Sequence, residues 1–200
     1  MKMVPVQRQG GYYFAMNNAT THPILRPVDC SYGRHAAAIL AIFNDAIVNS
    51  TALYDYEPRT LASMQDWFQA KSKGGFPVIG IESEAGELLG FASYGTFRAW
   101  PAYKYTVEHS VYVAARQRGL GLGRALLQAL IQRARDNQRH VMIGGIDAGN
   151  SGSIALHEGL GFKHAGTIRE VGFKFGRWLD LAFYQLALDT PAHPVDGGGG

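Results

Sequence analysis

The chain has 200 residues, of which 46% are hydrophobic and 18% charged, with a formal net charge of +3 and a pI near 9.0. This balance is typical of one globular domain, and the scattered Lys and Arg residues disfavour a nucleic-acid-binding chain. No apolar run approaches the roughly 20 residues of a membrane span, and the single cysteine, Cys30, excludes an internal disulfide and fits a reducing compartment such as the cytoplasm.

The two ends of the chain differ from its middle. Residues 1–22 show no sustained periodicity, which predicts an irregular N-terminal extension. Residues 190–200 contain two prolines and end in four glycines, a composition typical of a flexible tail. Residues 23–189 therefore form the expected single domain.

The domain begins with a strand and two helices. A short strand is expected at residues 24–27, and apolar side chains at helical spacing predict a helix at residues 33–49. Residues 50–59 form a loop that contains Tyr54. Thr60 can then cap the N-terminus of a second helix, and Gly74 marks its end.

The centre of the domain combines a hairpin with a strand–turn–helix unit. Runs of residues that favour strands at 77–82 and 88–94 predict two strands joined by a tight turn. An aromatic loop follows at residues 96–103. The next run is apolar and β-branched, passes through a glycine-rich turn, and continues into a helix that ends near Asn137.

The last part of the domain predicts a buried strand, a helix and two strands. The apolar run at residues 141–146 is typical of a parallel strand. A helix starts at Asn150 or Ser151, and strands are expected at residues 162–168 and 179–188, on either side of a loop. This alternation predicts an α/β domain: a mixed sheet with helices on both faces.

The turn before the central helix has the sequence Arg118-Gly-Leu-Gly-Leu-Gly123. Glycines let the backbone approach a ligand, and the free N–H groups of the following helix suit a phosphate. The dinucleotide pattern G-x-G-x-x-G fails, because Arg124 or Leu126 occupies the third glycine position, and there is no Gly-Lys-Ser/Thr triplet. The remaining R-x-x-G-x-G pattern predicts a phosphate cradle, although such turns are often only structural.

Several motifs together resemble the GNAT superfamily of N-acetyltransferases. They are T-V-E-H-S-V-Y-V at residues 106–113, R-x-x-G-x-G at 118–123, and D-x-x-N-S-x-S-x-x-L-H-E-x-L-G-F at 147–162. Y-G-T-F-R at 94–98, Ala102-Tyr103 and G-F-K-F-G-R-W-L-D at 172–180 resemble its phosphinothricin and methionine sulfoximine N-acetyltransferase branch. The resemblance extends from residue 24 to 188. It implies the GNAT acyl-CoA N-acyltransferase fold, with a central, mostly antiparallel sheet, a splayed parallel pair of strands and helices on both faces.

The resemblance also implies an enzyme that transfers acetyl from acetyl-CoA to an amino group, by direct attack in a ternary complex. It assigns the binding of acetyl-CoA to Val111, Tyr112, Val113, Arg118, Gly119, Leu120, Gly121, Leu122, Gly123, Arg124, Asn150 and Ser153. Asn150 has an alternative role as the N-cap of the following helix. The 172–180 segment resembles one near a dimer interface, so we expect a homodimer. The seven histidines lack metal-ligand spacing, with no H-E-x-x-H motif and no paired cysteine, so we expect no metal.

Two catalytic residues are expected. Glu108 is a carboxylate within a strand, where such residues are depleted, and it is our candidate for the general base through a water, with a pKa raised by burial. His157 stands where the resemblance implies a group that protonates or stabilises the thiolate. Strand alternation places Ser110 on the face of Glu108 and turns His109 to the opposite face, where we expect a satisfied structural histidine.

The acceptor is expected to be a small amino-acid derivative. Substrate-binding residues implied by the resemblance are Tyr54, Arg98, Trp100, Tyr103, Glu108 and Ser110. Arg98 would bind anionic groups, and Trp100 replaces a second basic residue found in phosphinothricin-selective members, which favours methionine sulfoximine or sulfone. Alternatives are an acetyltransferase for another amine (a protein N-terminus, a polyamine or an antibiotic) and a non-catalytic module that binds acyl-CoA. A nucleotide-binding protein is disfavoured by the missing glycine and Lys-Ser/Thr.

Overall fold

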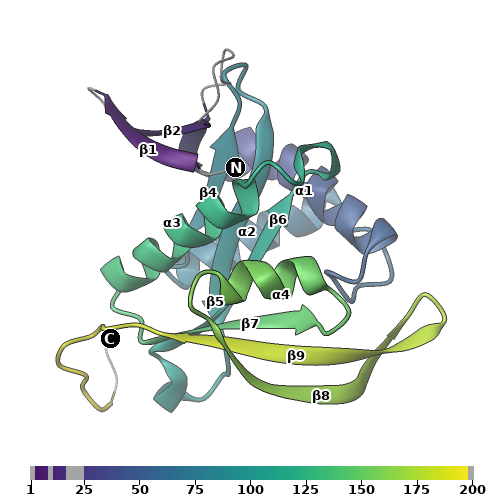
Figure 1. Ribbon diagram of the computed structural model, residues 1–200, viewed down its shortest axis with the longest axis vertical. Coiled ribbons are helices and arrows are strands. Elements are labelled where there is room, and N and C mark those ends of the chain that lie inside the picture. Colours follow the sequence, from purple (N-terminus) through teal and green to yellow (C-terminus); the bar gives the residue numbers. More distant parts are fainter. Residues whose placement is uncertain (1–2, 9–10, 17–24, 198–200) are drawn as a thin grey trace.

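A computed structural model describes residues 3–8, 11–16 and 25–197. Its helices and strands alternate along the chain (Figure 1). Strands are β1 (Met3–Arg8), β2 (Gly11–Met16), β3 (Arg26–Asp29), β4 (Val78–Glu82), β5 (Leu88–Thr96), β6 (Thr106–Val113), β7 (Val141–Asp147), β8 (Lys163–Lys174) and β9 (Arg177–Ala187). Helices are α1 (Tyr32–Asn49), α2 (Leu61–Lys73), α3 (Leu122–Asp136) and α4 (Ser151–Glu158), with short 3₁₀ turns at Pro101–Tyr103 and Ala115–Gln117.

A seven-stranded sheet in the order β3-β4-β5-β6-β7-β9-β8 forms the centre of the molecule. β6 and β7 are parallel, and the other neighbours are antiparallel. Helices α3 and α4 cover one face, and α1 and α2 cover the other (Figure 1). The expected mixed sheet with one parallel pair and helices on both faces is confirmed.

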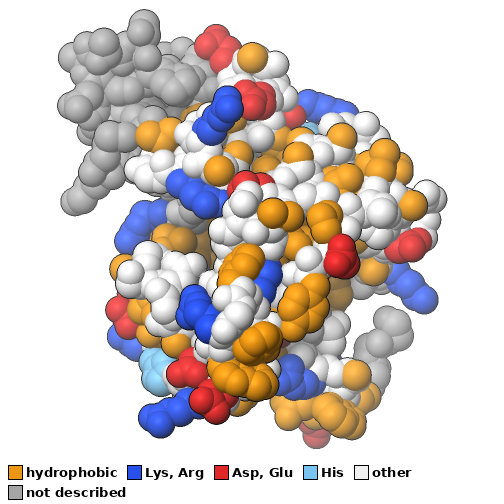
Figure 2. All heavy atoms as spheres, turned by 90° about the vertical axis from the view of Figure 1, so that its right-hand side faces the viewer, with side chains coloured by type: hydrophobic (Ala, Val, Ile, Leu, Met, Phe, Trp, Pro, Cys, Tyr) orange, Lys and Arg blue, Asp and Glu red, His pale blue; other side chains and the backbone are white. Residues whose placement is uncertain are grey.

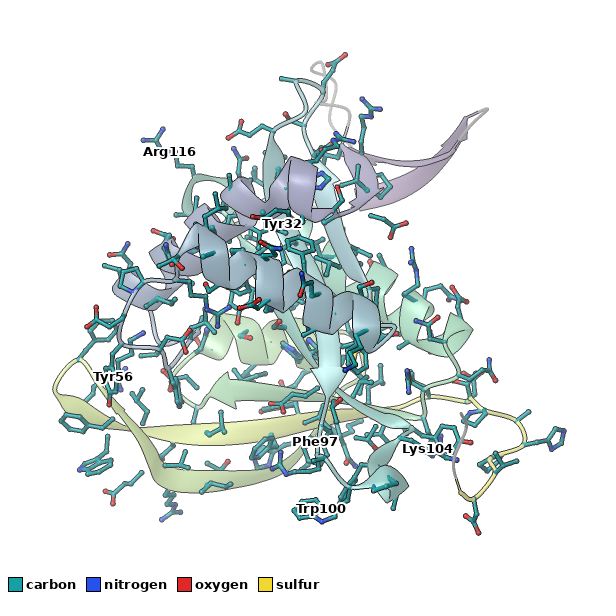
Figure 3. The ribbon with its side chains drawn as sticks, turned by 180° about the vertical axis from the view of Figure 1, so that it is seen from behind. Tyr32, Tyr56, Phe97, Trp100, Lys104 and Arg116 are labelled. Carbon is teal, nitrogen blue, oxygen red and sulfur yellow. The ribbon has the colours of Figure 1, made fainter. Side chains whose placement is uncertain are left out.

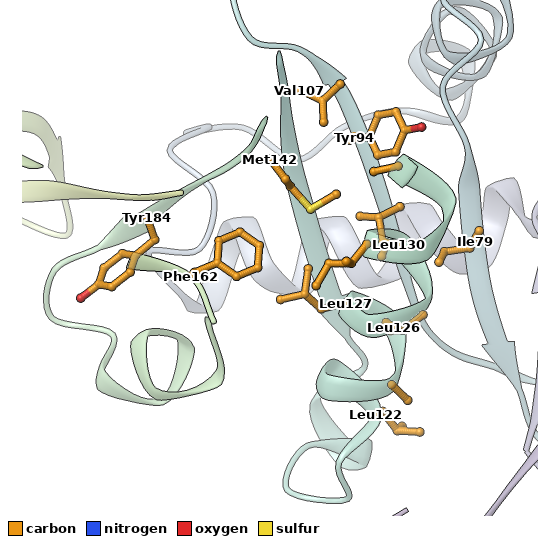
Figure 4. Packing of buried hydrophobic residues seen from close by; sticks show 14 of the residues in the cluster. Ile79, Tyr94, Val107, Leu122, Leu126, Leu127, Leu130, Met142, Phe162 and Tyr184 are labelled. Carbon is orange, nitrogen blue, oxygen red and sulfur yellow. The ribbon is translucent and has the colours of Figure 1, made fainter. Parts of the chain in front are cut away.

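Each face of the sheet has its own apolar core. On the α3 side, Leu126, Leu127 and Leu130 follow helical spacing and pack toward Met142 and Phe162 (Figure 4). The other core joins α1 and α2 to β4 and β5, with Ile39, Phe43, Met64, Val78 and Phe91 among its members. The two cores pack against opposite faces of the sheet that contains β6, and this packing fixes the directions in which the side chains of β6 point.

The predicted helix ends are confirmed at several positions. The Thr60 hydroxyl accepts a hydrogen bond from the Ser63 N–H, and the Ser63 side chain reaches back to the Thr60 backbone, which makes a capping box. Helix α2 ends at Gly74. Asn150 caps α4, because its side-chain oxygen accepts a hydrogen bond of 3.0 Å from the Ser153 N–H. None of the helices in the described residues is long and apolar enough to cross a membrane.

Two expected irregular regions contain strands instead. The first is the N-terminal extension, where β1 and β2 pair as an antiparallel hairpin. Val, Tyr and Phe favour strands. Two short runs that contain these residues can pair as a hairpin, although they are too short to show a sustained periodicity in the sequence. The second is the expected loop at 172–178, where β8 and β9 pair as far as Lys174 and Arg177.

The β8–β9 turn consists of only two residues, Phe175 with φ 54° and Gly176 with φ 73°. Two successive positive φ values are typical of a type I′ turn. A phenylalanine rarely adopts this conformation, which explains why the sequence did not predict so short a connection.

The described part of the expected tail, residues 190–197, forms no helix or strand but contacts the domain. The Lys104 ammonium donates a hydrogen bond of 2.6 Å to the Gly197 carbonyl, and the Val195 N–H donates one of 3.1 Å to the Tyr105 hydroxyl. These bonds tie residues 195–197 to the start of β6.

Candidate active site

The parallel strands β6 and β7 diverge along their length. Their ladder joins Thr106 to Val141 and ends where His109 faces Gly144. Beyond that point β6 continues to Val113, paired only with β5, while β7 continues to Asp147, paired only with β9, within the described chain. The facing edges of the two strands therefore keep backbone N–H and C=O groups free for a ligand.

A cavity of about 920 Å³ occupies this divergence. It is bordered by both strands, by the turn before α3, by α4 and by the α1–α2 loop. Among the lining residues are Thr51, Tyr54, Lys71, Glu108, His109, Ser110, Val111, Tyr112, Val113, Gln117, Arg118, Gly119, Gly121, Leu122, Gly123, Asp147, Asn150, Ser153 and His157. Residues far apart in the sequence thus meet around one space.

The turn before α3 forms one end of the cavity. Gly119 and Gly121 both have φ near 80°, a left-handed conformation that glycine adopts without strain. Gly121 is the N-cap, and no side chain caps the helix. The first N–H groups of α3 consequently have no intrahelical partner and carry the positive end of the helix dipole, which suits a phosphate group.

Two predicted residues of this turn have side chains directed elsewhere. The Leu120 side chain is exposed, and the Arg124 guanidinium donates a hydrogen bond of 3.1 Å to the Gly159 carbonyl. Neither residue lines the cavity. Arg118 does line it, while its guanidinium forms an ion pair of 3.2 Å with Asp45. Leu120 and Arg124 can therefore contribute to an anion site at this turn only through their backbone N–H groups, not through their side chains.

Glu108 lies half-buried on the cavity wall. One carboxylate oxygen, Oε1, lies 3.2 Å from the place where a Cβ on Gly145 would stand, so a side chain at residue 145 would crowd this carboxylate. Burial raises the pKa of Glu108, and the positive charge of Arg98 partly offsets that rise. A carboxylate with a raised pKa in a cavity is a stronger candidate for a general base than an exposed one.

His109 and His157 meet on the opposite side of β6. Their Nε2 atoms lie 3.2 Å apart, both rings are buried, and they stack with their centroids 5.1 Å apart. His157 Nδ1 lies 2.6 Å from the Ser153 carbonyl, which can only accept, so Nδ1 carries a proton. For neutral rings, His157 Nε2 then accepts from His109 Nε2–H.

This tautomer leaves His109 Nδ1 as an unprotonated, buried atom with no hydrogen-bond partner in the described residues. Our expectation of a satisfied structural histidine is therefore wrong. The side-chain alternation is as predicted, but the divergence of the strands opens the cavity to both faces of β6, and His109 lines it as Glu108 does. Burial lowers the pKa of His109 to about 3 and also lowers the pKa of His157.

The α1–α2 loop supplies another wall. The Tyr54 hydroxyl is buried without a hydrogen-bond partner in the described chain, and burial, followed by the charge of Asp147, raises the pKa of this phenol. The Asp147 carboxylate accepts hydrogen bonds from the Thr51 hydroxyl and from the Gly149 N–H. Tyr54 and Asp147 are thus close enough to interact on the cavity wall, and Ser110 of β6 lines the same cavity.

Three of the predicted acceptor-binding residues do not line the cavity. Arg98, Trp100 and Tyr103 belong to the β5–β6 connection, which continues past the edge of the sheet (Figure 3). Arg98 is exposed, and its guanidinium lies over the Phe97 ring, 4.2 Å from the centroid, and donates to the Phe97 carbonyl. The resemblance implied these three residues, and of them Arg98 is close enough for its charge to act on Glu108, although its side chain does not line the cavity.

Several lining residues were not predicted, including Thr51, Lys71, Gln117 and Asp147. Lys71 belongs to α2, whose last turn is otherwise exposed. One signal was available: Gly95 interrupts the strand β5, and a glycine inside a strand often marks a close approach by another group. The group that approaches it is the Lys71 ammonium, 3.4 Å from the place of a Cβ at residue 95.

Comparison with known proteins agrees with this architecture. The model of a family described as "Acetyltransferase (GNAT) family" matches residues 39–162. The chain is 54% identical over 151 residues to an L-methionine sulfoximine/L-methionine sulfone acetyltransferase of Pseudomonas paraeruginosa, which covers 76% of this chain and 88% of that protein.

Solved structures show the same fold. A candidate acetyltransferase from Acinetobacter baylyi ADP1 is 60% identical, with a TM-score of 0.87, over 88% of this chain and all of that one. A GNAT superfamily phosphinothricin acetyltransferase from Sinorhizobium meliloti, in complex with acetyl-CoA, is 34% identical, with a TM-score of 0.82, over 87% of this chain and 94% of that one.

Proposed function

Because the chain belongs to the acetyltransferase (GNAT) family and is an acetyl-CoA-dependent acetyltransferase, we propose that it acetylates the amino group of a small amino-acid derivative of the methionine sulfoximine or sulfone type, or of the related phosphinothricin type. The position of Glu108 carries this proposal. Its half-buried carboxylate lies on the wall of the cavity that ends in the glycine turn. The similarity to the P. paraeruginosa enzyme supports the sulfoximine or sulfone type as the preferred acceptor.

The residues present fit acetyl-CoA as the donor, which supplies the acetyl group as a thioester. The free N–H groups at the start of α3 would hold its pyrophosphate, assisted by the helix dipole. The unpaired edge of Ser110 to Val113 would pair with the pantetheine arm, and an N–H of this edge would polarise the thioester carbonyl. Asn150 caps α4 with its side-chain oxygen, which leaves its amide N–H₂ group to donate toward the cavity.

Glu108 would take the proton of the acceptor's ammonium through a water. The raised pKa brings the carboxylate closer to the pKa range of an efficient base. His157 Nε2 would stabilise the departing thiolate once that nitrogen carries a proton. In the neutral pair this nitrogen accepts from His109 Nε2–H, and His109 cannot give up its only ring proton without becoming an imidazolate, so the proton would come from water in the cavity and His157 would become an imidazolium.

Direct attack in a ternary complex fits the side chains better than a covalent acyl-enzyme. Cys30 is the only cysteine of the chain, it does not line the cavity, and burial raises the pKa of its thiol to about 12. A thiol with so high a pKa is a poor nucleophile at neutral pH. The single free cysteine also supports a reducing compartment, and we place the enzyme in the cytoplasm.

An exposed apolar surface supports the proposal of a homodimer. Five side chains of the β8–β9 hairpin, here called the hairpin patch, are 46–60% exposed: Ile168, Val171, Phe173, Phe175 and Trp178. Apolar side chains gather in the lower half of the face shown in Figure 2. Exposed large apolar side chains concentrated on one hairpin are typical of a protein–protein contact, and a second copy of the chain is the partner we propose.

A turnover screen tests the proposed acceptor. Release of free thiol from acetyl-CoA would be measured with methionine sulfoximine, methionine sulfone, phosphinothricin, the common amino acids, a polyamine and a short peptide. We expect the highest kcat/KM for methionine sulfoximine or sulfone. Turnover restricted to the polyamine or the peptide would contradict the acceptor assignment, and no turnover of any amine would contradict catalysis itself.

A further inference from the structure

Lys71 is a half-buried cation that lines the cavity. It projects from the last turn of α2 across β5, and its Nζ donates a hydrogen bond of 2.8 Å to the Tyr94 carbonyl. Gly95 faces Glu108 in the β5–β6 register. Because opposed residues of neighbouring strands share a face of the sheet, Lys71 and Glu108 line the cavity from the same face, with the Lys71 ammonium over β5 and the Glu108 carboxylate directed toward Gly145 of β7.

The hydrogen-bonding capacity of Lys71 is largely unused. An ammonium has three donors, and the Tyr94 carbonyl is its one hydrogen-bond acceptor among the described residues. No carboxylate of the described chain lies within 4.0 Å of its Nζ. The rings of Trp67 and Phe76 lie 5.4 and 5.9 Å away, and burial lowers the pKa of Lys71 to about 8.

Lys174 is a lysine with a structural role, and it provides a comparison for Lys71. Its buried ammonium donates to three carbonyls, those of Ile47, Ser50 and Leu53, at 2.6, 3.0 and 2.6 Å. All three of its donors are used at the C-terminal end of α1. Lys71, by contrast, retains free donors and a charge without a counter-ion beside a cavity, and both favour an anionic ligand.

We propose that Lys71 binds the α-carboxylate of the acceptor, so that the site selects α-amino acids over simple amines. This inference rests on the proposed function and deepens it. In an α-amino acid the amino and carboxylate groups are attached to the same carbon, so an acceptor with its amine toward Glu108 would direct its carboxylate toward the side of the cavity that Lys71 lines. Arg98 is exposed and donates to its own loop, so Lys71 is the cation that lines the cavity itself, while the charge of Arg98 acts on Glu108 from outside the lining.

The other charges around the cavity agree with this orientation. Asp147 belongs to β7, whereas Lys71 crosses β5, so the two lie on opposite sides of Glu108 on β6. A carboxylate is repelled by Asp147 and attracted by Lys71. Arg118 lies at the glycine turn, at the end of the cavity that suits phosphate groups, and pairs with Asp45. Lys71 is thus the cation that faces the acceptor side among the described lining residues.

Two acceptors and four variants test the proposal. L-Methionine sulfone would be compared with its decarboxylated analogue, 3-(methylsulfonyl)propan-1-amine, in the wild type, Lys71→Met, Lys71→Arg, Lys73→Met and Arg98→Ala. We expect Lys71→Met to raise KM for the amino acid about 10- to 100-fold, the loss of one charge-assisted hydrogen bond, without raising KM for the amine. Lys71→Arg should retain most of the preference, and Lys73→Met, on the exposed side of the same helix, should behave as the wild type.

The outcomes separate the two claims. An equal change in KM for both acceptors in Lys71→Met, no change for either, or a rise specific to the amino acid in Arg98→Ala alone would overturn the role of Lys71 while the proposed function stands. A wild type that accepts the amine but no amino acid would overturn both the acceptor and the role of Lys71. Thermal unfolding of each variant shows that a change in KM does not follow from misfolding.

Discussion

His109 and His157 form a buried imidazole pair, with 3.2 Å between their Nε2 atoms and one hydrogen between them in the neutral state. The Ser153 carbonyl fixes this arrangement, because it requires a proton on His157 Nδ1. The pair connects β6 to α4 across the point where the parallel strands diverge. Its two rings cannot both be charged at low cost, because burial desolvates both imidazolium ions and their like charges repel each other.

Stability should fall on acidification because of this pair. The native pKa of His109, about 3, lies below the ordinary value of 6.5, so between these limits the unfolded chain binds a proton that the native chain does not. The free energy of unfolding therefore decreases as pH falls from 6.5 toward 3, and it is fully retained above 6.5. Urea unfolding at pH 7 and pH 5 measures the difference, which His109→Gln should reduce.

His164→Gln is the matched control for this measurement. His164 is exposed, contacts the Thr167 hydroxyl at 2.8 Å and lies outside the buried histidine pair. The control should keep the pH dependence of the wild type. Equal pH dependence in His109→Gln and the wild type would show that His109 is not held neutral by folding.

Glu108→Gln should lower kcat about 10²- to 10⁴-fold, the usual contribution of a general base. In the wild type, kcat/KM should rise with pH through the pKa of Glu108, which burial places above its ordinary value. Arg98→Ala removes a positive charge that lowers this pKa, so the rise should move to higher pH. A pH profile of kcat/KM for the three proteins provides the test, and full turnover of Glu108→Gln at every pH would exclude the base.

Gly119→Ala should weaken the binding of acetyl-CoA. Residue 119 has φ 80°, where an added Cβ costs about 1–2 kcal/mol, and nothing lies within 4 Å of that Cβ to compensate. The turn should relax and misdirect the N–H groups at the start of α3. Calorimetric titration with acetyl-CoA should show the loss of affinity.

Gly86→Ala provides a control with the same backbone strain. Gly86 has φ 81°, also has nothing within 4 Å of an added Cβ, and lies in the β4–β5 turn, outside the cavity lining. We expect a similar loss of stability and an unchanged affinity for acetyl-CoA. Equal affinity losses in both variants would assign the effect to general destabilisation.

Phe175→Ser should shift the proposed homodimer toward monomer. Phe175 is 58% exposed at the tip of the β8–β9 hairpin, so its removal has little effect on the core while it removes apolar area from the hairpin patch. Sedimentation at several concentrations would measure the shift. Val48→Ser, which changes a 52% exposed residue of α1, should leave the state unchanged, and a monomeric wild type would contradict the dimer.

Much of the fold follows from local sequence. The predicted helix ends are present in the structure: Thr60 and Asn150 cap two helices, and a helix ends at Gly74. Each helix end depends on residues that are close in sequence. The misjudged hairpin turn at Phe175 depends instead on pairing between β8 and β9, which stabilises a conformation that phenylalanine alone avoids.

The candidate site divides in the same way. Glu108, the glycine turn and His157 belong to contiguous motifs, and the structure places all of them around one cavity. Arg98 and Trp100 belong to a similar stretch of sequence, yet their loop leaves the sheet and their side chains lie outside the cavity lining. A contiguous motif determines which residues are neighbours within one helix or strand, but it does not determine the path of the loop that follows.

The sequence by itself determined the order of strands and helices after residue 24 and the glycine turn with its carboxylate, because these depend on short-range spacing, and the resemblance of its motifs indicated the family. Only the tertiary structure decided that His109 pairs with His157 and that Lys71 reaches the cavity over Gly95. Both contacts join elements distant in sequence. Their geometry follows from where β6 separates from β7 and how α2 packs on β5, which no local pattern encodes.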